Sequence, residues 1–520
     1  MCRSIVAGLV TAILVAGAAN AQERVEIRSN DGALVIRGEI QPSDNDVYVV
    51  NSAVGMLTIP RELASCTGAA CPPDISDQKE FNITGASVAG GDLLVRLIAG
   101  YAEAQSAEVF VDFVAETRTM QMNIANASDE QLATVSISRA DSTTAYEKLL
   151  SGESQVILAT RRPTDEERAA FAAAGKSNDI SSANEVVLAL DGLAIVVADG
   201  NPLRSISLDD AAGIFSGQID NWAAFGGPDA PIRVVASGTD TATSTFFQDQ
   251  VLGPRQTAIM SSLDTATSEE EVVSIVRDDA RAIGLTTITA ATNVKALPIR
   301  QACGLVAPPT SFAVKSEEYP LARRLFLYSL SSGIPARAQE FIDYALSDTG
   351  QQRIAEAGFV SQSVEQRDMN AFGMRLATAL ISSSDNRELR QLRTMADELV
   401  DSVQLSSTLR FRTGSAELDS KALSDIQRLA KQFNSPQFGN REVILVGFTD
   451  SIGRVDLNNI LSQRRALQVR ESIVAASEGA LDPRLVKVLG FGPTAPIGCN
   501  DSVEGRDVNR RVEVWVKDAG

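Results

Sequence analysis

A chain of 520 residues is too long for a single hydrophobic core, and its length predicts roughly three domains. The formal net charge of -19 argues against nucleic acid as a partner, because phosphate backbones require clusters of Lys and Arg that this sequence lacks. The sequence has no His, which removes the commonest general base and metal ligand and every Ser–His or Cys–His nucleophile pair. We therefore expect a binding or structural protein with no catalytic residues, metal or cofactor, rather than an enzyme.

Residues 1–21 are typical of a secretory signal peptide. Arg3 provides a short basic start, residues 5–17 form an apolar core too short to span a bilayer, and the small residues 19–21 suit cleavage before Gln22. A retained helical anchor is the alternative. No later apolar run is long enough to cross a membrane, so we expect an exported protein.

Four cysteines follow the signal segment. In an oxidising compartment, Cys66 and Cys71 are expected to close a small disulfide loop. A metal site is another use for four cysteines, but their spacing does not suit zinc and there is no His to assist. The sequence leaves open whether Cys303 and Cys499 pair or stay free.

Residues 22–76 predict a small all-β module. Short runs rich in Val, Ile and Tyr recur with turn residues between them, and Asp31-Gly32 separates two such runs as in a hairpin. The predicted Cys66–Cys71 loop would staple this module. No function follows from its sequence.

Residues 78–361 alternate predicted strands and helices, which is the signature of an α/β fold. Strands are expected over 185–190 and 193–198, and helices over 322–329 and 337–346. We expect this region to form the largest domain of the chain.

Several motifs in this region resemble the phosphate-binding proteins of phosphate ABC transporters, the PstS-like family. They are Asp191–Val197, Asn201–Leu203, Ile214–Trp222 and Gly226-Gly227, and segments at 282–285, 319–323 and 347–360 follow in the same order. The resemblance implies a two-lobed periplasmic-binding-protein fold with phosphate or a similar oxyanion as ligand. It also makes an ABC permease a candidate partner.

Anions are captured at helix N-termini, where unpaired N–H groups and Ser or Thr hydroxyls face the ligand. Four loops of the PstS-like region lie where such capture is expected, and each is also a good capping or turn sequence. The expected phosphate-binding residues are Ser87, Ser142, Thr143, Thr160, Arg161, Ser237 and Thr239.

Three features depart from the PstS-like pattern. The family's proton-accepting Asp is expected at Gln155, whose amide cannot select an anion by its charge. Asp240 would repel an anion if it faced the cleft, and the cleft arginine is either Arg161 or Arg233. These departures leave open an alternative function, a structural cell-envelope protein whose binding-protein domain no longer binds phosphate.

Residues 362–405 are polar and charged, and apolar residues recur in them at mixed three and four spacing. This pattern predicts a helical connector. A coiled-coil dimer is the alternative, although no heptad is sustained.

Residues 443–448 predict a buried strand, and Asp450–Gly453 predict a turn. The apolar residues after this turn recur at helical spacing and predict a helix. The motif Thr449-Asp450-x-x-Gly453, then Asn458, then Leu461-Ser462-x-x-Arg465-Ala466, resembles the OmpA-like peptidoglycan-binding domain. Asn509-Arg510-Arg511-Val512-Glu513 matches the end of that family's pattern. The resemblance implies an α+β domain of order βαβαββ over residues 406–520.

The diaminopimelate residue of a peptidoglycan stem peptide carries a free ammonium and a free carboxylate, so its pocket needs an anion beside a cation. The resemblance assigns these roles to Asp450 and Arg465, with Asn458 in support and Arg510 or Arg511 as a second cation. A solvated salt bridge between a loop and a helix is the alternative. The two resemblances together predict a periplasmic protein associated with the cell wall or outer membrane.

Overall fold

The computed structural model describes residues 24–518 except for 31, 42–46, 69, 72–77, 87–91, 115–118, 240, 369–372, 374–375, 378, 381–384, 412–416, 437 and 440. The chain divides into two compact units, Met1–Asp77 and Gln78–Gly520. The predicted signal segment lies outside the described residues. Within the described residues, no helix is long and apolar enough to cross a membrane.

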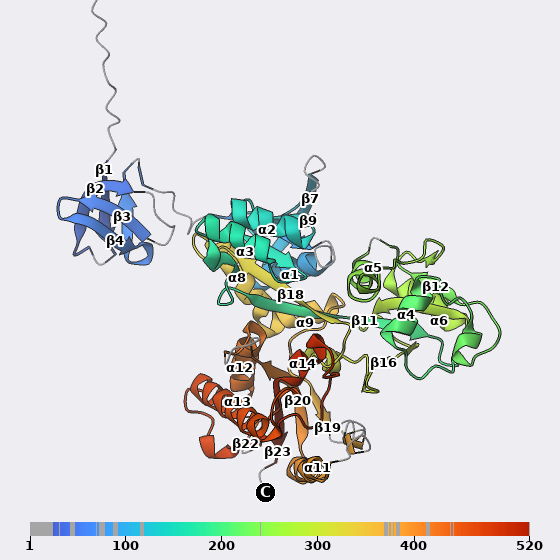
Figure 1. Cartoon of the computed structure of the whole chain (residues 1–520). Helices are drawn as coiled ribbons and strands as arrows, with labels where there is room; N and C mark the ends of the chain where they lie inside the picture. Colours follow the sequence, from blue (N-terminus) through green and yellow to red (C-terminus); the bar gives the residue numbers. More distant parts are fainter. Residues whose placement is uncertain are drawn as a thin grey trace, which may run out of the picture. The chain divides into compact units, whose positions relative to one another are not determined.

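The first unit is a five-stranded antiparallel sheet of order β4-β3-β2-β1-β5, drawn in blue in Figure 1. Alternate residues point inward, so that Val25, Ile27 and Val50 form a small core. Cys66 and Cys71 form a disulfide just after the last strand begins. The strands are β1 (Arg24–Ser29), β2 (Val35–Gln41), β3 (Val47–Ser52), β4 (Gly55–Pro60) and β5 (Ala64–Thr67).

A continuous sheet runs through residues 80–329 of the second unit. Its order is β13-β12-β14-β11-β18-β10-β6-β9-β8-β7, and β15 pairs with β11. The strands are β6 (Glu80–Ala86), β7 (Ala107–Val114), β8 (Thr119–Asn126), β9 (Gln131–Ala140), β10 (Val156–Ala159), β11 (Val186–Val197), β12 (Arg233–Ala236), β13 (Asp264–Thr265), β14 (Ala282–Thr287), β15 (Lys295–Ala296) and β18 (Ala322–Ser329). A separate pair, β16 (Ile299–Arg300) and β17 (Val306–Ala307), forms a short hairpin.

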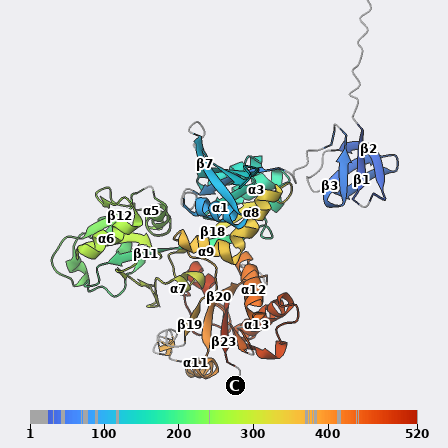
Figure 2. The same cartoon turned by 180° about the vertical axis from the view of Figure 1, so that it is seen from behind.

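The long strand β11 belongs to two lobes. Its residues 186–192 pair with β18, and its residues 193–197 pair with β14. In Figures 1 and 2 one group of helices lies around β18 and another lies around β12, the neighbour of β14 in the sheet. The first lobe carries α1 (Asp92–Ala104), α2 (Ser142–Ser151), α3 (Asp165–Ala173), α8 (Ala336–Leu346) and α9 (Asp348–Glu356); the second lobe carries α4 (Leu208–Phe215), α5 (Ala242–Phe247) and α6 (Glu269–Asp278).

The predicted helix over 322–329 is wrong, because these residues form strand β18. β18 lies between β10 and β11 in the sheet, and its last five residues are buried. An apolar run buried on both faces of a sheet shows no alternation, so its pattern does not separate a central strand from a buried helix. The two strands predicted over 185–190 and 193–198 are a single strand for the same reason.

The C-terminal domain has a five-stranded sheet of order β19-β20-β23-β21-β22, which confirms the predicted α+β class. Its elements are β19 (Gln366–Asp368), α11 (Asn386–Leu399), β20 (Val403–Arg410), α12 (Ser420–Phe433), β21 (Glu442–Gly447), α13 (Val455–Ala476), β22 (Val486–Gly490), α14 (Val503–Asn509) and β23 (Arg511–Lys517). Helices α12 and α13 pack on one face of this sheet, and α11 packs on the other against Ile444, Val446 and Trp515. Residues 362–405 therefore supply an edge strand and a covering helix to this domain.

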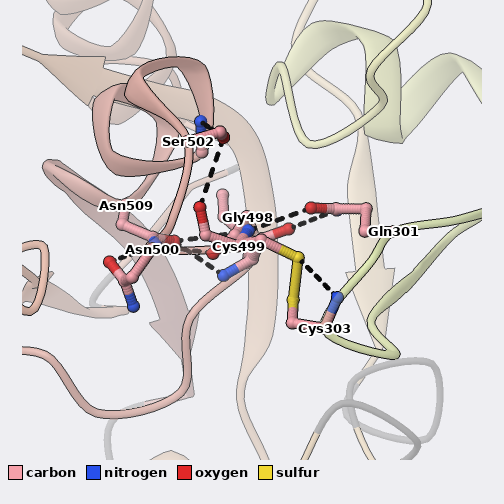
Figure 3. The surroundings of a disulfide bond; sticks show 9 residues. Gln301, Cys303, Gly498, Cys499, Asn500, Ser502 and Asn509 are labelled. Atoms are coloured by element: carbon pink, nitrogen blue, oxygen red, sulfur yellow. Dashed lines mark hydrogen bonds between the residues drawn. A yellow bond between two sulfur atoms is a disulfide. The ribbon is translucent and has the colours of Figure 1, made fainter.

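Buried ion pairs and a disulfide join the C-terminal domain to the two-lobed domain. Arg324 lies on β18 opposite Leu190 of β11, near the point where β11 passes from one lobe to the other, and this region is called the hinge below. Arg324 pairs with Asp419 of the C-terminal domain, with 2.8 Å between Nη2 and Oδ2. Arg410 donates to the carboxylate of Glu317 (3.2 Å). Cys303, in the β16–β17 hairpin of the second lobe, forms a disulfide with Cys499 (Figure 3).

Candidate functional site

The first candidate site lies where β21 ends and α13 begins. Gly447 closes the strand, and a Cβ there would lie 2.1 Å from the carbonyl oxygen of Ser462, so only glycine lets α13 pack this close. Gly453 has a φ of 94°, which suits the turn that leads into α13. The predicted strand, turn and helix are therefore present, and they place Asp450 just beyond the carboxyl end of β21.

Asp450 forms its ion pair with Arg510. Oδ2 of Asp450 lies 2.8 Å from Nη1 of Arg510, and the two side chains are only 13% and 18% exposed. The other carboxylate oxygen accepts the backbone N–H of Ile452 at 3.0 Å. The loop after β21 and the residue just before β23 thus present one partly buried carboxylate–guanidinium pair.

Arg465 lies beside this pair without joining it. Its guanidinium stacks on Phe411, 5.1 Å from the ring centroid, and its buried Nη1 finds no hydrogen-bond acceptor among the described residues. Burial lowers the pKa of Arg465, the nearby Arg510 lowers it further, and Asp450 partly offsets both. A half-buried cation with an unused donor is costly on its own, and a ligand carboxylate would satisfy it.

Asn458 and Arg511 stabilise the domain instead of facing this site. The Asn458 side chain donates to the carbonyl oxygens of Ile452 (3.0 Å) and Asp450 (3.4 Å), which fixes the loop. Arg511 is fully buried, pairs with Glu513 at 2.8 Å and stacks on Phe448. Arg510, which follows α14 and precedes β23, is the one that reaches the site.

The second candidate site lies at the carboxyl ends of β9 and β10 in the first lobe. Ser142 and Thr160 place their hydroxyl oxygens 3.2 Å apart, and the Thr160 N–H donates to Ser142 Oγ at 3.1 Å. Arg161 donates to the Thr143 hydroxyl at 2.8 Å. Four of the predicted phosphate-binding residues are thus gathered around the start of α2.

The charge of Arg161 is already matched by Glu167. The two guanidinium nitrogens of Arg161 lie 2.7 and 2.8 Å from the two Glu167 oxygens, and this pairing raises the pKa of Arg161. Glu167 also completes a capping box with Thr164 at the start of α3. An incoming anion would compete with this carboxylate for Arg161.

The predicted loop of the second lobe also faces a carboxylate. Ser237 and Thr243 each donate to Oε1 of Glu269 at 2.8 Å. Thr239 is exposed in the loop before α5. The remaining residues of interest, Ser87 and Asp240, lie outside the described residues.

The proposed roles of Gln155 and Arg233 are wrong. Gln155 precedes β10 at the amino end of the strand, where its side chain accepts from the Asn82 N–H (2.8 Å) and donates to the Gly152 carbonyl (3.1 Å). Arg233 begins β12 and pairs with Asp264. In an α/β sheet ligands bind at the carboxyl ends of parallel strands, and both residues lie at the other end.

Three residues that shape these sites were not predicted from the sequence. Phe411 lies against the guanidinium of Arg465. Glu167 neutralises the charge of Arg161, and Glu269 accepts the hydrogen bond of Ser237 that was expected to go to an anion. Only Glu167 leaves a sequence signal, since Thr164-x-x-Glu167 is a capping-box pattern. Within the described part of the chain, no cluster of three His, Cys, Asp or Glu side chains could hold a metal ion.

Comparisons with known proteins match two separate parts of the chain. Residues 108–349 match the family model of the PBP superfamily domain, and residues 410–510 match that of the OmpA family. The phosphate-binding protein PstS of Staphylococcus haemolyticus is 26% identical over 45% of this chain and 74% of its own length. Outer membrane porin F of Pseudomonas aeruginosa is 31% identical over 22% of this chain and 32% of its own length.

Among solved structures, an ABC-type phosphate transport receptor from Vibrio cholerae aligns with 54% of this chain and 99% of its own, at 21% identity and a TM-score of 0.40. By the two family models and the similarity to PstS, the chain combines a PBP-like domain with a C-terminal OmpA domain. Both families are typically non-enzymatic.

Proposed function

We propose that this protein binds peptidoglycan non-covalently through Asp450, Arg465 and Arg510 of its OmpA domain. The observation that supports this most is the unused Nη1 donor of Arg465 beside the Asp450–Arg510 pair. A diaminopimelate carboxylate would bind between the two guanidinium groups, and the ammonium of the same residue would approach Asp450. The protein is then a periplasmic, wall-associated binding protein without catalytic activity.

Sedimentation with peptidoglycan sacculi tests this proposal. Asp450→Ala and Arg465→Ala each remove one member of the charge cluster, which should cost roughly 2 to 5 kcal/mol and abolish weak binding. Arg484→Ala is the matched control, because Arg484 is 90% exposed and pairs with Asp482, two residues before it in the chain. If both site variants sediment like wild type and the control, the proposal is refuted.

For the PBP-like domain we propose a small oxyanion, phosphate in the first place, as the ligand of Ser142, Thr143, Thr160 and Arg161. Support comes from the grouping of three hydroxyls and a guanidinium at the start of α2, where the helix dipole favours negative charge. Calorimetric titration of the full chain with phosphate and sulfate tests this. Heat with wild type that disappears in Thr160→Val would support it.

A second function has its own supporting observation. Glu269 accepts from the loop that should hold the anion, and its Oε2 is buried without a hydrogen-bond partner among the described residues. A bare carboxylate oxygen repels an oxyanion. A structural envelope protein with an unliganded PBP-like domain is therefore the alternative, and it predicts no heat with either anion.

A further inference from the structure

A cavity of about 1370 Å³ lies between the OmpA domain and both lobes of the PBP-like domain. Its volume exceeds the ~300–1,000 Å³ of ordinary small-ligand pockets, so it suits a longer ligand. Residues of the first lobe, of the second lobe, of the hinge and of the OmpA domain line it. None of the phosphate-site residues Ser142, Thr143, Thr160 and Arg161 is among them.

The peptidoglycan site proposed above adjoins this cavity, although Asp450 and Arg465 themselves are not among the residues that line it. Arg510, the partner of Asp450, lines the cavity, and so does Phe411, on which Arg465 stacks. A ligand group held between Arg465 and Arg510 would therefore lie at the cavity wall. Whatever the ligand carries beyond that group would continue into the cavity.

The second lobe supplies two arginines to the opposite wall. Arg255 and Arg300 line the cavity, and each pairs with one aspartate, Asp209 at 2.6 Å and Asp210 at 3.3 Å. Asp209 is 84% exposed and the Arg300 pair is long, so both pairs are weak. Both guanidinium groups can therefore accept an additional carboxylate at little cost.

The two walls are held together by one loop. Gln301, next to Arg300, donates to the Ile497 carbonyl at 3.0 Å and accepts the Cys499 N–H at 3.0 Å. Asn509, next to Arg510, accepts the N–H groups of Ile497 (2.8 Å) and Gly498 (3.0 Å). Figure 3 shows Gln301 and Asn509 on either side of this loop.

The Cys303–Cys499 disulfide adds a covalent link at the same point (Figure 3). The link ties the β16–β17 hairpin, which carries Arg300, to the loop that packs against Asn509. Pre-organised walls spare a ligand the cost of ordering them. In the oxidised protein the disulfide therefore restricts how far the hairpin that carries Arg300 can move from the loop beside Arg510.

The charges of the OmpA side of the cavity differ from those of the second lobe. Asp501, Glu504 and Asp507 lie on the OmpA side, and Arg510 also pairs with Asp507. The OmpA side of the cavity thus carries these three carboxylates together with Arg410 and Arg510. A zwitterionic ligand with further carboxylates fits this polarity.

We propose that the PBP-like domain forms the second wall of the peptidoglycan site. A stem peptide whose diaminopimelate end is held by the OmpA domain extends across the cavity, and the free carboxylate of its γ-linked glutamate binds Arg255 and Arg300. This inference rests on the proposed peptidoglycan function and assigns the PBP-like domain a role in it. Arg255 and Arg300 then select peptides over free diaminopimelate.

Calorimetric titration of the full-length protein with two probes tests this inference. The probes are free meso-diaminopimelate and the tripeptide L-Ala-γ-D-Glu-meso-diaminopimelate. In the double variant Arg255→Ala/Arg300→Ala the Kd of the tripeptide should rise about tenfold, the combined effect of two accessible ion pairs, with the Kd of free diaminopimelate unchanged. Arg281→Ala is the matched control, since Arg281 is a comparably exposed arginine of the second lobe outside the cavity.

A charge-reversed variant, Arg255→Glu/Arg300→Glu, should weaken tripeptide binding further and again spare free diaminopimelate. Equal tripeptide affinity in wild type and in both double variants would overturn the inference while the OmpA site stands. The inference would also be overturned if wild type bound the two probes with equal affinity, or if the variants lost affinity for both probes to the same extent. If wild type binds neither probe, the peptidoglycan function itself fails.

Discussion

Removing the Cys303–Cys499 disulfide should destabilise the junction between the PBP-like and OmpA domains. The two cysteines are 196 residues apart in sequence, and the entropy of closing so long a loop corresponds to about 5 kcal/mol at 25 °C. The Cys66–Cys71 link spans a separation of only 5 residues, for which the same relation gives about 2 kcal/mol. The double variant Cys303→Ser/Cys499→Ser should therefore lose more stability than Cys66→Ser/Cys71→Ser.

Intrinsic fluorescence during urea unfolding suits this comparison. The two tryptophans report on different parts, since Trp222 is buried in the second lobe and Trp515 in the OmpA sheet. Single-tryptophan proteins made by Trp222→Phe or Trp515→Phe follow each part separately. In wild type we expect nearly coincident transitions, and without the Cys303–Cys499 link both transitions should move to lower urea and separate from each other.

The control is the Cys66→Ser/Cys71→Ser protein, whose missing disulfide lies in the other compact unit. It should leave both tryptophan transitions unchanged. If the Cys303→Ser/Cys499→Ser protein also unfolds like wild type at both tryptophans, the disulfide does not couple the domains, and the reasoning from loop entropy is refuted.

Two further changes test the packing that positions the sites. Gly447→Ala should place its Cβ against the Ser462 carbonyl, displace α13, lower Tm by several degrees and weaken binding to sacculi; wild-type Tm would contradict the close approach. Glu317→Gln should cost roughly 3 to 5 kcal/mol in urea unfolding, because it leaves Arg324 and Arg410 buried with less counter-charge. Burial alone would raise the pKa of Glu317, but Arg324 and Arg410 lower it well below its ordinary value of 4.5, so its stabilisation is complete above pH 4.5 and is lost as pH falls below that. Acid unfolding curves of wild type and Glu317→Gln should therefore converge at low pH, and a constant gap between them would contradict this assignment.

Local motifs were the part of the fold that the sequence could predict. The Thr449-Asp450-x-x-Gly453 turn, the strand before it and the helix after it depend on residues that are close in sequence. The turn also needs a backbone conformation at Gly453 that favours glycine. The start of α2 is local in the same sense, because the Asp141 side chain accepts the N–H of Thr144 three residues later. The Thr449-Asp450-x-x-Gly453 motif also led to the OmpA family, and the motifs from Asp191 to Gly227 led to the PstS-like one.

Partners distant in sequence could not be predicted. Nothing in the sequence shows that Glu269 reaches Ser237, or that Phe411 lies beneath Arg465, because only the tertiary fold brings these side chains together. The family resemblance, and not the spacing, predicted that Asp450 would act together with Arg465, yet the direct ion pair of Asp450 is with Arg510, 60 residues away. The Cys303–Cys499 pairing could not be predicted for the same reason, since two cysteines 196 residues apart give no sequence signal that they are close in space.

The contacts of the OmpA domain bear on how the PBP-like domain can work. The OmpA domain contacts the first lobe where Ser420 donates to Glu185, the hinge where Arg324 pairs with Asp419, and the second lobe at the Cys303–Cys499 disulfide. Binding proteins commonly close their lobes around a ligand by hinge motion. Here such closure would have to break buried ion pairs or strain a covalent link, and a small oxyanion would have to supply that free energy from its own binding. A large ligand that fills the existing cavity requires no closure, so this arrangement favours peptidoglycan over phosphate as the ligand that uses both domains.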